Sequence, residues 1–561
     1  MPRDDHIDKP YLPNRKDFHL EKGTVMKSLM KKVFAAAAAI ATVFGLAATT
    51  VATANAAGGN ATLTVSTKDA KFAGKTVNAY KMFSATVSGD GGAVSHTLTD
   101  GWKPFFMSST LDGLTGVTDA NVNDKANEYV SKLTGKEKDL TAFAAKASNW
   151  AQTKTNNITA DATATVSKNA ATDGKYTATF TGLDYGYYVV AVPGATLADA
   201  KGQYAALVRV HSTTVGVDIK GDLPTVDKKV QVNGTGQDAT DAKIGDTLTF
   251  TLTSTIPDMS AYDTYTFNFK DTLSKGLTFE RVTSVKVGDT TLTKDTDYTV
   301  TTAPADSGKT LLTVAMNDFK AKQQANAGKK ITVTYTATLN KDAVVGGAGN
   351  VNSATIQYSN DPSTNGTGDS EPSKVRVFTY GFTVDKYTGD NYTAEAVRLP
   401  GAKFTLAPKD GDPMSFVQVN AGSATANAVY RVAKAGETGT TTITTPENGK
   451  VDFRGLKNGE YTLTETEAPA GYNKLASVIG VKVDGRNDGT DATHATVTIT
   501  YNNDNNGSNY DQTASNGVIP VRNKSGVILP GTGGMGTIAF TVIGVLVIAL
   551  GVAWTLKRKN A

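Results

Sequence analysis

The chain has 561 residues, a net charge of +4, 54 glycines and no cysteine. A chain this long exceeds one domain and predicts about three or four. The lack of cysteine excludes disulfide bonds, and the small net charge without a basic, aromatic-rich patch argues against a nucleic-acid partner. The abundant glycine and the short apolar runs favour strands and turns over helical bundles.

The first 56 residues are typical of an export signal. A basic stretch begins at Met26, an apolar run covers 33–52, and a small-residue cleavage site ends at Ala56. This order predicts a mature chain that begins at Ala57. Residues 1–25 are polar and without pattern, so Met26 is an alternative start. The competing interpretation of the apolar run is a membrane anchor.

The C-terminal end contains three signals in order. The motif Leu529-Pro530-Gly531-Thr532-Gly533 precedes the uncharged run Thr537–Leu556, and three basic residues, Lys557 to Lys559, follow. Twenty residues at about 1.5 Å each can cross a hydrocarbon core of about 30 Å. The combination resembles the sorting signal of Gram-positive surface proteins, which sortase cleaves between Thr and Gly before attachment to peptidoglycan. The alternative is an ordinary single-span membrane protein.

Two breaks divide the exported part of the chain. One is the glycine- and proline-containing segment 220–225, and the other lies near Phe378 after a turn-rich stretch. They predict a leader (1–56), three domains (57–222, 223–378 and 379–528) and a terminal sorting segment (529–561).

Apolar residues alternate with threonine in each of these domains. The clearest runs are Thr247–Thr253, Ile331–Ala337 and Ala495–Tyr501. Because this period of two puts apolar side chains on one face of a strand, we expect a mostly β chain. The predicted architecture is three tandem immunoglobulin-like β-sandwiches, with a small helical insertion over 120–133 in the first domain.

The third domain places three reactive side chains on apolar faces. Lys386 shares a face with Phe382 and Val384, Glu465 lies on the face of its strand with Tyr461 and Leu463, and Asn523 follows Ile519 and Val521. Burial favours the uncharged form of an amine and of an acid. A neutral amine can attack a carboxamide that a neighbouring acid polarises. Surface side chains that extend into solvent are the alternative.

The run Leu463–Tyr472 resembles the E-box of Cna B-type domains in sortase-assembled pilins. The resemblance implies that Glu465 catalyses an isopeptide bond between Lys386 and Asn523.

The middle domain resembles the A-type domains of the same pilins, with weaker signals. The resemblance implies a second triad of Lys228, Asn352 and the acid Asp271, with Lys229 and Asn350 as alternatives one step away in their strands.

The first domain repeats the G-L-x-x-G-x-Y spacing of the third. Residues 182–192 match 455–465 in this spacing, but Val192 stands where the third domain has Glu465. We therefore predict no isopeptide bond in the first domain.

Lys220 lies at the end of the first domain. Val215, Val217 and Lys220 match the Val-x-Val-x-x-Lys spacing of the pilin motif of major pilins, although Asp218 and Ile219 replace its Tyr-Pro. The resemblance implies that Lys220 is the intermolecular acceptor for Thr532 of another subunit. An ordinary exposed linker lysine is the alternative.

The whole mature chain therefore resembles the major subunit of a cell-wall-anchored pilus. The implied partners are sortase, other copies of the chain, accessory pilins, peptidoglycan and a host-surface ligand. We expect no cofactor and no external enzymatic substrate. The loop 484–491 lacks the closing glutamate of a calcium loop, so no metal site is expected either. The alternatives are a monomeric wall-anchored adhesin and a tip or basal pilin.

Overall fold

The computed structural model describes residues 60–87, 94–156, 158–171, 173–200, 202–362, 364–486, 495–502, 510–526 and 535–559. The expected cleavage point at Ala56 and Ala57 and the motif 529–533 lie outside these ranges. Contacts divide the chain into two compact units. The first unit holds the N-terminal domain and most of the middle domain. The second holds the third domain with the segments 239–247 and 338–350.

The N-terminal domain contains two sheets. The smaller has the order β5-β1-β8, and its inward residues Ala61, Leu63 and Val65 are buried as the alternation on β1 requires. The larger has the order β3-β2-β6-β7, with β4 also on β2. The strands are β1 (Ala61–Thr67), β2 (Thr76–Val87), β3 (Val94–Leu98), β4 (Ala162–Thr165), β5 (Tyr176–Leu183), β6 (Gly186–Thr196), β7 (Gln203–Val210) and β8 (Thr214–Asp218).

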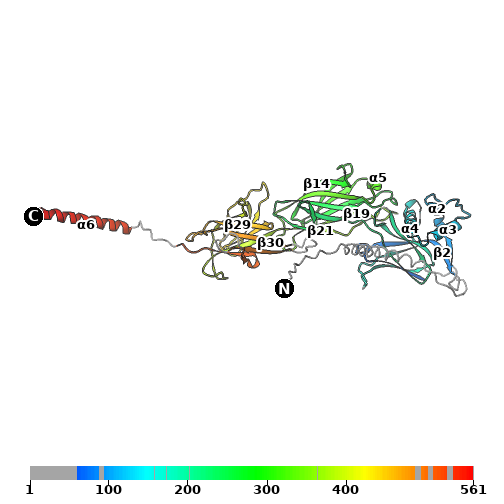
Figure 1. Ribbon diagram of the computed structural model, residues 1–561, viewed down its shortest axis with the longest axis horizontal. Helices are drawn as coiled ribbons and strands as arrows, with labels where there is room; N and C mark the ends of the chain where they lie inside the picture. The colour runs from blue at the N-terminus through cyan, green and yellow to red at the C-terminus, as the bar shows by residue number, and fades with distance from the viewer. Residues whose placement is uncertain are drawn as a thin grey trace, which may run out of the picture. The chain divides into compact units, whose positions relative to one another are not determined.

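The helical insertion is larger than predicted. The expected helix is α3 (Val122–Leu133), and it is joined by α2 (Lys103–Met107) and α4 (Glu137–Gln152) (Figure 1). The sequence analysis missed α4, although its buried residues follow the helical spacing of three and four: Leu140, Phe143, Ala144, Ala147 and Ala151. This face packs against β6 and β7 and covers the larger sheet.

The middle domain is a second sandwich. Its first sheet has the order β10-β9-β12-β18-β14-β15, and β12 and β18 are the strands predicted over 247–253 and 331–337. The strands are β9 (Asp227–Val232), β10 (Thr235–Gln237), β12 (Thr247–Thr255), β14 (Leu277–Val287), β15 (Thr290–Thr291) and β18 (Lys330–Leu339).

The facing sheet of the middle domain runs β21-β19-β13-β17-β16, with β20 also on β19. Its strands are β13 (Phe267–Leu273), β16 (Tyr298–Ala305), β17 (Lys309–Met316), β19 (Asn350–Ser359), β20 (Thr367–Asp369) and β21 (Ser373–Phe378), and α5 (Phe319–Gln323) follows β17. In the second unit, β11 (Ala239–Asp241) pairs in parallel with the end of β21.

The third domain is again a two-sheet sandwich. One sheet runs β23-β22-β28-β26-β25 with β33 beside β22, and the other runs β27-β24-β29-β30-β31-β32. The strands are β22 (Tyr380–Thr388), β23 (Val397–Arg398), β24 (Lys403–Pro408), β25 (Phe416–Asn420), β26 (Ala428–Val432), β27 (Ile443–Thr444), β28 (Lys450–Leu456), β29 (Gly459–Glu467), β30 (Ile479–Arg486), β31 (Thr496–Tyr501), β32 (Gln512–Thr513) and β33 (Val518–Arg522). The structure thus confirms a mostly β chain built of sandwiches.

The repeated glycine spacing corresponds to the same turn in two domains. Gly182 and Gly455 both have positive φ, 73° and 85°, which glycine adopts without a steric penalty. Each precedes a short turn that leads into a buried strand of the other sheet, β6 or β29. The first and last strands also pair in parallel in both domains, β1 with β8 and β22 with β33. The two domains therefore share a framework.

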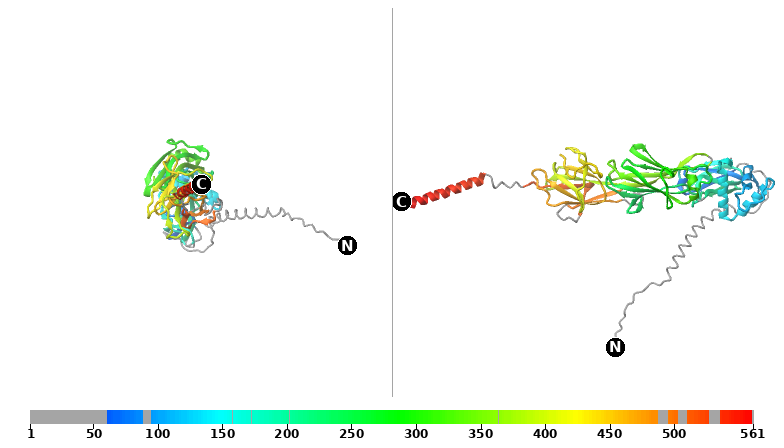
Figure 2. Two further views of the ribbon diagram at one scale, coloured as in Figure 1. Left: turned by 90° about the vertical axis from the view of Figure 1, so that its left-hand side faces the viewer. Right: turned by 90° about the horizontal axis from the view of Figure 1, so that it is seen from above.

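The predicted apolar run Thr537–Leu556 coincides with α6 (Met535–Lys559), drawn in red in Figure 2. The side chains of 535–543 lie outside the described residues. In the part of the chain that was described, no helix is both long and apolar enough to span a membrane.

Candidate functional site

The third domain brings its three predicted residues together in the core. Lys386 lies on β22, Glu465 on β29 of the facing sheet, and Asn523 directly after β33. Because β22 and β33 pair with Lys386 opposite Val521, Asn523 lies close beyond the lysine along the paired strand. All three side chains are at most 2% exposed.

Glu465 bridges the amine and the carboxamide with its two oxygens. Lys386 Nζ lies 3.1 Å from Oε1, and Asn523 Nδ2 donates to Oε2 at 3.0 Å. The backbone N–H of Leu475 also donates to Oε2, at 2.8 Å, and the carbonyl of Asn473 accepts from Asn523 Nδ2 at 2.8 Å. The acid and the carboxamide are therefore held from two sides.

Burial makes Lys386 a potential nucleophile. Desolvation lowers its pKa to about 8, although the nearby Glu465 acts in the opposite direction. The ring of Phe404 lies 5.7 Å from Nζ and contributes to the apolar surroundings. With this pKa, about one amine in ten is neutral at pH 7, compared with fewer than one in a thousand for an ordinary lysine.

The middle domain places Lys228, Asp271 and Asn352 at another buried cluster, on β9, β13 and β19. The structure also separates the two alternatives from it. Lys229 Nζ bonds to Asp238 at 2.6 Å, outside the core. The side chain of Asn350 bonds to the backbone of its own loop and of β21.

Tyr335 lies at the centre of the middle cluster and was not among the residues predicted from the sequence. Its Oη accepts from Lys228 Nζ at 2.8 Å and from Asn352 Nδ2 at 2.6 Å, and it donates to Asp271 Oδ2 at 2.6 Å. Lys228 Nζ also contacts Asp271 Oδ2 directly. The sequence did contain an indication of this residue. The alternation of Ile331–Ala337 points Tyr335 inward, and a buried tyrosine hydroxyl needs a hydrogen-bond partner.

Desolvation lowers the pKa of Lys228 to about 8, with Asp271 opposing the shift. The rings of Phe250 and Tyr335 lie 5.3 and 5.1 Å from its Nζ. Such rings attract an ammonium through their faces, which compensates part of the lost hydration. The amine is thus held in place and is partly neutral near neutral pH.

The two clusters join different parts of their sandwiches. In the third domain, Lys386 and Asn523 belong to neighbouring parallel strands of one sheet. In the middle domain, Lys228 belongs to one sheet, while Asp271 and Asn352 lie on adjacent strands of the facing sheet. A bond between Lys386 and Asn523 would tie two neighbouring strands of one sheet, and a bond between Lys228 and Asn352 would tie the two layers.

The first domain has apolar residues at the positions of the third-domain cluster. The N–H of Ile219 donates to Ser66 O at 2.7 Å, as the N–H of Asn523 donates to Tyr387 O at 3.0 Å. This register matches Ile219 to Asn523 and Val65 to Lys386, and the glycine spacing matches Val192 to Glu465. All three replacements are buried and none can form an amide bond.

Lys220 is exposed on a backbone that is fixed on both sides. Ile219 is bonded to β1, and Asp222 exchanges two backbone hydrogen bonds with Thr196, at 2.7 and 2.8 Å. Gly221 packs on the ring of Tyr204, where a Cβ would lie 2.5 Å from a ring atom. The segment therefore presents the lysine from a well-defined position.

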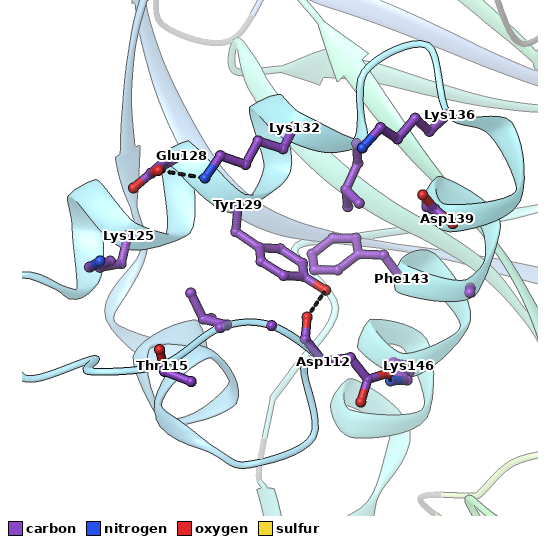
Figure 3. A pocket seen from close by; sticks show the side chains of 14 residues that line it. Asp112, Thr115, Lys125, Glu128, Tyr129, Lys132, Lys136, Asp139, Phe143 and Lys146 are labelled. Carbon is purple, nitrogen blue, oxygen red and sulfur yellow. Dashed lines mark hydrogen bonds and ion pairs between the residues drawn. The ribbon is translucent and has the colours of Figure 1, made fainter.

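A pocket of about 420 Å³ lies in the helical insertion (Figure 3). Tyr129 and Phe143 form part of its wall, and charged pairs lie around them, Lys132 with Glu128 at 2.6 Å and Lys146 with Asp112 at 2.9 Å. None of the predicted site residues lines it. Its mixture of aromatic and charged groups is suited to a polar ligand.

Two family models match the chain in succession. Residues 244–362 match the Gram-positive pilin backbone subunit 2, Cna-B-like domain, and residues 390–500 match the prealbumin-like fold domain. The first match includes Asp271 and Asn352, and the second includes Glu465. The family that matches the middle domain is described as Cna-B-like, whereas the sequence had resembled an A-type domain there.

The chain is also 25% identical over 267 residues to the fimbrial subunit type 2 of Actinomyces naeslundii. The match covers 41% of this chain and 45% of the relative, so it spans less than half of the relative's length.

Similar solved structures include the T6 backbone pilin of Streptococcus pyogenes, with 16% identity, 83% and 99% coverage of the two chains and a TM-score of 0.43. The major pilin SpaD of Corynebacterium diphtheriae has 21% identity, 74% and 88% coverage and a TM-score of 0.36. TM-scores below 0.5 do not establish a common arrangement of domains. The two consecutive family matches and the fimbrial relative show that residues 244–362 and 390–500 are similar to domains of Gram-positive backbone pilins.

Proposed function

We propose that this protein is the repeating subunit of a covalent pilus on a Gram-positive cell surface. Sortase joins Thr532 of one copy to Lys220 of the next, and amide bonds inside the second and third domains stabilise each subunit. The observation that carries the proposal is the pair of buried clusters, each with a lysine, an acid and an asparagine, linked through Glu465 in the third domain and through Tyr335 in the middle domain. Accessory pilins and peptidoglycan are the further partners of such a fibre.

The proposed internal bond forms without an external reagent. Neutral Lys386 Nζ attacks Cγ of Asn523, the Nζ–Cγ bond forms, and the Cγ–Nδ2 bond breaks. One proton passes from Nζ through Glu465 to Nδ2, so ammonia leaves and nothing is oxidised. Both proton transfers are short, because Glu465 contacts Nζ with one oxygen and Nδ2 with the other.

The energetics of burial also support the bond. An amine and an acid without water lose hydration worth several kcal/mol each, in order of magnitude, and a pair recovers that cost only with good geometry. An amide formed by Lys386 or Lys228 has no charge to desolvate. A core with such a pair is therefore better explained as the precursor of a bond than as a stabilising ion pair.

The mass of the mature protein tests the two internal bonds together. We expect the exported chain to be lighter than its sequence by two ammonia masses, one for each cluster, with none from the apolar first-domain positions. Intact mass spectrometry measures the total, and peptide mapping locates the joined residues. Lys386→Ala and Lys228→Ala should each restore one ammonia mass. A full sequence mass for the wild-type chain would refute both bonds.

An uncross-linked third domain is expected to become more stable at alkaline pH. In an Asn523→Ala variant the amide bond cannot form, so the Lys386 amine can still bind and release a proton. Its pKa is about 8 in the folded domain, compared with 10.5 for an ordinary lysine. Below about pH 8 the folded and the unfolded chain both bind the proton, so burial of the charged amine destabilises the folded domain by its full amount. Between about pH 8 and 10.5 only the unfolded chain binds it, and the stability of the fold rises by about 3 kcal/mol.

Urea unfolding of the Asn523→Ala variant at about pH 7.5 and 10 measures this gain. The control variant, Asn523→Ala with Lys386→Met, has no amine at this position and should lack the gain. An equal rise in both variants would assign the effect to other groups.

A monomeric wall-anchored adhesin is the second candidate, and the pocket of the helical insertion favours it. The pilus and the adhesin differ in their products on the cell. Denaturing gels of wall extracts should show a ladder of high-mass species for a pilus and one anchored species for an adhesin.

A further inference from the structure

The two clusters differ in how the acid reaches the carboxamide. In the third domain, Glu465 contacts both Lys386 Nζ and Asn523 Nδ2. In the middle domain, Asp271 contacts Lys228 Nζ, whereas Nδ2 of Asn352 bonds to Tyr335 Oη at 2.6 Å. Aspartate is one methylene shorter than glutamate, and the tyrosine hydroxyl lies between the acid and the carboxamide.

Tyr335 is held firmly in this position. It is fully buried on β18, and its ring stacks on Phe250 of the neighbouring strand, with centroids 5.3 Å apart and an angle of 17°. Its hydroxyl makes three hydrogen bonds, two as acceptor and one as donor. This uses the whole hydrogen-bonding capacity of a phenol, so the group has one defined arrangement.

We propose that Tyr335 is a catalytic residue that relays a proton from Asp271 to the leaving nitrogen of Asn352 when the middle-domain amide bond forms. The inference rests on the proposed cross-link and extends it. Among the described residues of the third domain no hydroxyl lies between the acid and the carboxamide, and the longer Glu465 makes both contacts itself.

The relay starts from the charged lysine and conserves atoms, electrons and protons. The Lys228 ammonium gives one proton to Asp271, and the neutral Nζ then attacks Cγ of Asn352. Protonated Asp271 donates to Tyr335 Oη, which reverses their hydrogen bond and passes the hydroxyl proton to Nδ2. The Cγ–Nδ2 bond breaks, ammonia leaves, and the second proton of Nζ returns to Asp271. Tyr335 and Asp271 both end protonated, and no electrons are transferred.

The surroundings of Tyr335 allow its hydroxyl to relay a proton but prevent it from acting as a general base. Burial, the negative Asp271 and the hydrogen bond between them hold its pKa well above the ordinary value. The phenol therefore keeps a proton throughout the physiological pH range. It can pass that proton on only while it receives another, which the bond to Asp271 allows.

The variant Tyr335→Phe tests the relay, because it keeps the ring and removes the hydroxyl. The full-length secreted chain is purified and its mass is followed over days. We expect the third-domain ammonia loss to be complete and the middle-domain bond to form at least about 100-fold more slowly than in the wild type. Peptide mapping assigns each loss to its domain, so the third domain serves as an internal standard.

Tyr265→Phe is the matched control. Tyr265 is buried in the same domain, and its hydroxyl has no hydrogen-bond partner among the described residues. This variant should lose two ammonia masses as the wild type does. A Tyr335→Phe chain that forms the middle bond at the wild-type rate would overturn the relay.

A second variant separates loss of the relay from loss of folding. In Tyr335→Phe with Asp271→Glu, the longer acid can reach Lys228 and Asn352 together, as Glu465 reaches its partners in the third domain. We expect the middle bond to return, whereas a folded double variant without it would contradict the relay. A wild-type chain without a middle bond would instead refute the proposed function, and this inference with it.

Discussion

Replacing Glu465 with alanine is expected to restore one ammonia mass to the mature protein and to destabilise its third domain. Without the acid, no other described residue contacts both Lys386 Nζ and Asn523 Nδ2, so we expect the amide bond not to form. The bond closes a loop of more than one hundred residues. By analogy with a disulfide, losing that constraint costs about 4–5 kcal/mol. Intact mass and the unfolding transition of the third domain measure the two effects.

Glu467→Ala is the control for this variant. Glu467 lies on the same strand two residues later, but it is exposed and pairs with Lys403 at 2.7 Å. Surface pairs of this kind contribute about 0–1 kcal/mol, so this variant should keep both amide bonds and nearly all of its stability. If Glu465→Ala retained the two-ammonia deficit, the catalytic assignment of the glutamate would be wrong.

Lys220→Arg is expected to abolish the ladder of covalent polymers while the monomer is still exported. Arginine keeps the positive charge, but its guanidinium stays protonated and cannot act as the amine nucleophile. Because Lys220 is exposed and its neighbours Ile219 and Asp222 hold the backbone, the substitution should leave the fold unchanged. Denaturing gels of wall extracts measure the ladder.

Lys175→Arg is the control for the acceptor lysine. Lys175 lies in the same domain. Its Nζ lies 3.5 Å from Oδ1 of Asp218, and Asp218 stands two residues before Lys220 in the sequence. Its replacement should leave the ladder intact. A ladder that persists in Lys220→Arg would move the acceptor to another lysine, which a junction peptide with Thr532 would then identify.

The position of Asn523 gives the proposed third-domain bond a mechanical role. It directly follows the last strand and stands nine residues before Thr532. Tension that enters the subunit at Thr532 would reach β33 first, and β33 is held to β22 by parallel backbone pairing. With an amide bond between Lys386 and Asn523, this load passes through covalent bonds, and the strand pair no longer has to resist it through its unfolding barrier.

Local patterns identified much of the chain before its fold was known. A period of two placed Lys386, Glu465 and Asn523 on inward faces, because alternate side chains of a strand always point the same way. The same reasoning identified β12, β18 and β31. It missed α4, whose apolar residues are mostly alanine and whose helical spacing was overlooked among the strands.

What the sequence by itself determined was the set of inward-facing groups, since these follow from the local period of two along each strand. The tertiary structure decided which of these groups meet. It placed Lys228 and Asn352 in one cluster and Lys229 and Asn350 outside it, and it added Tyr335. Which side chains meet depends on the pairing of strands far apart in the chain and on which faces of two sheets pack together. No local sequence pattern contains that information.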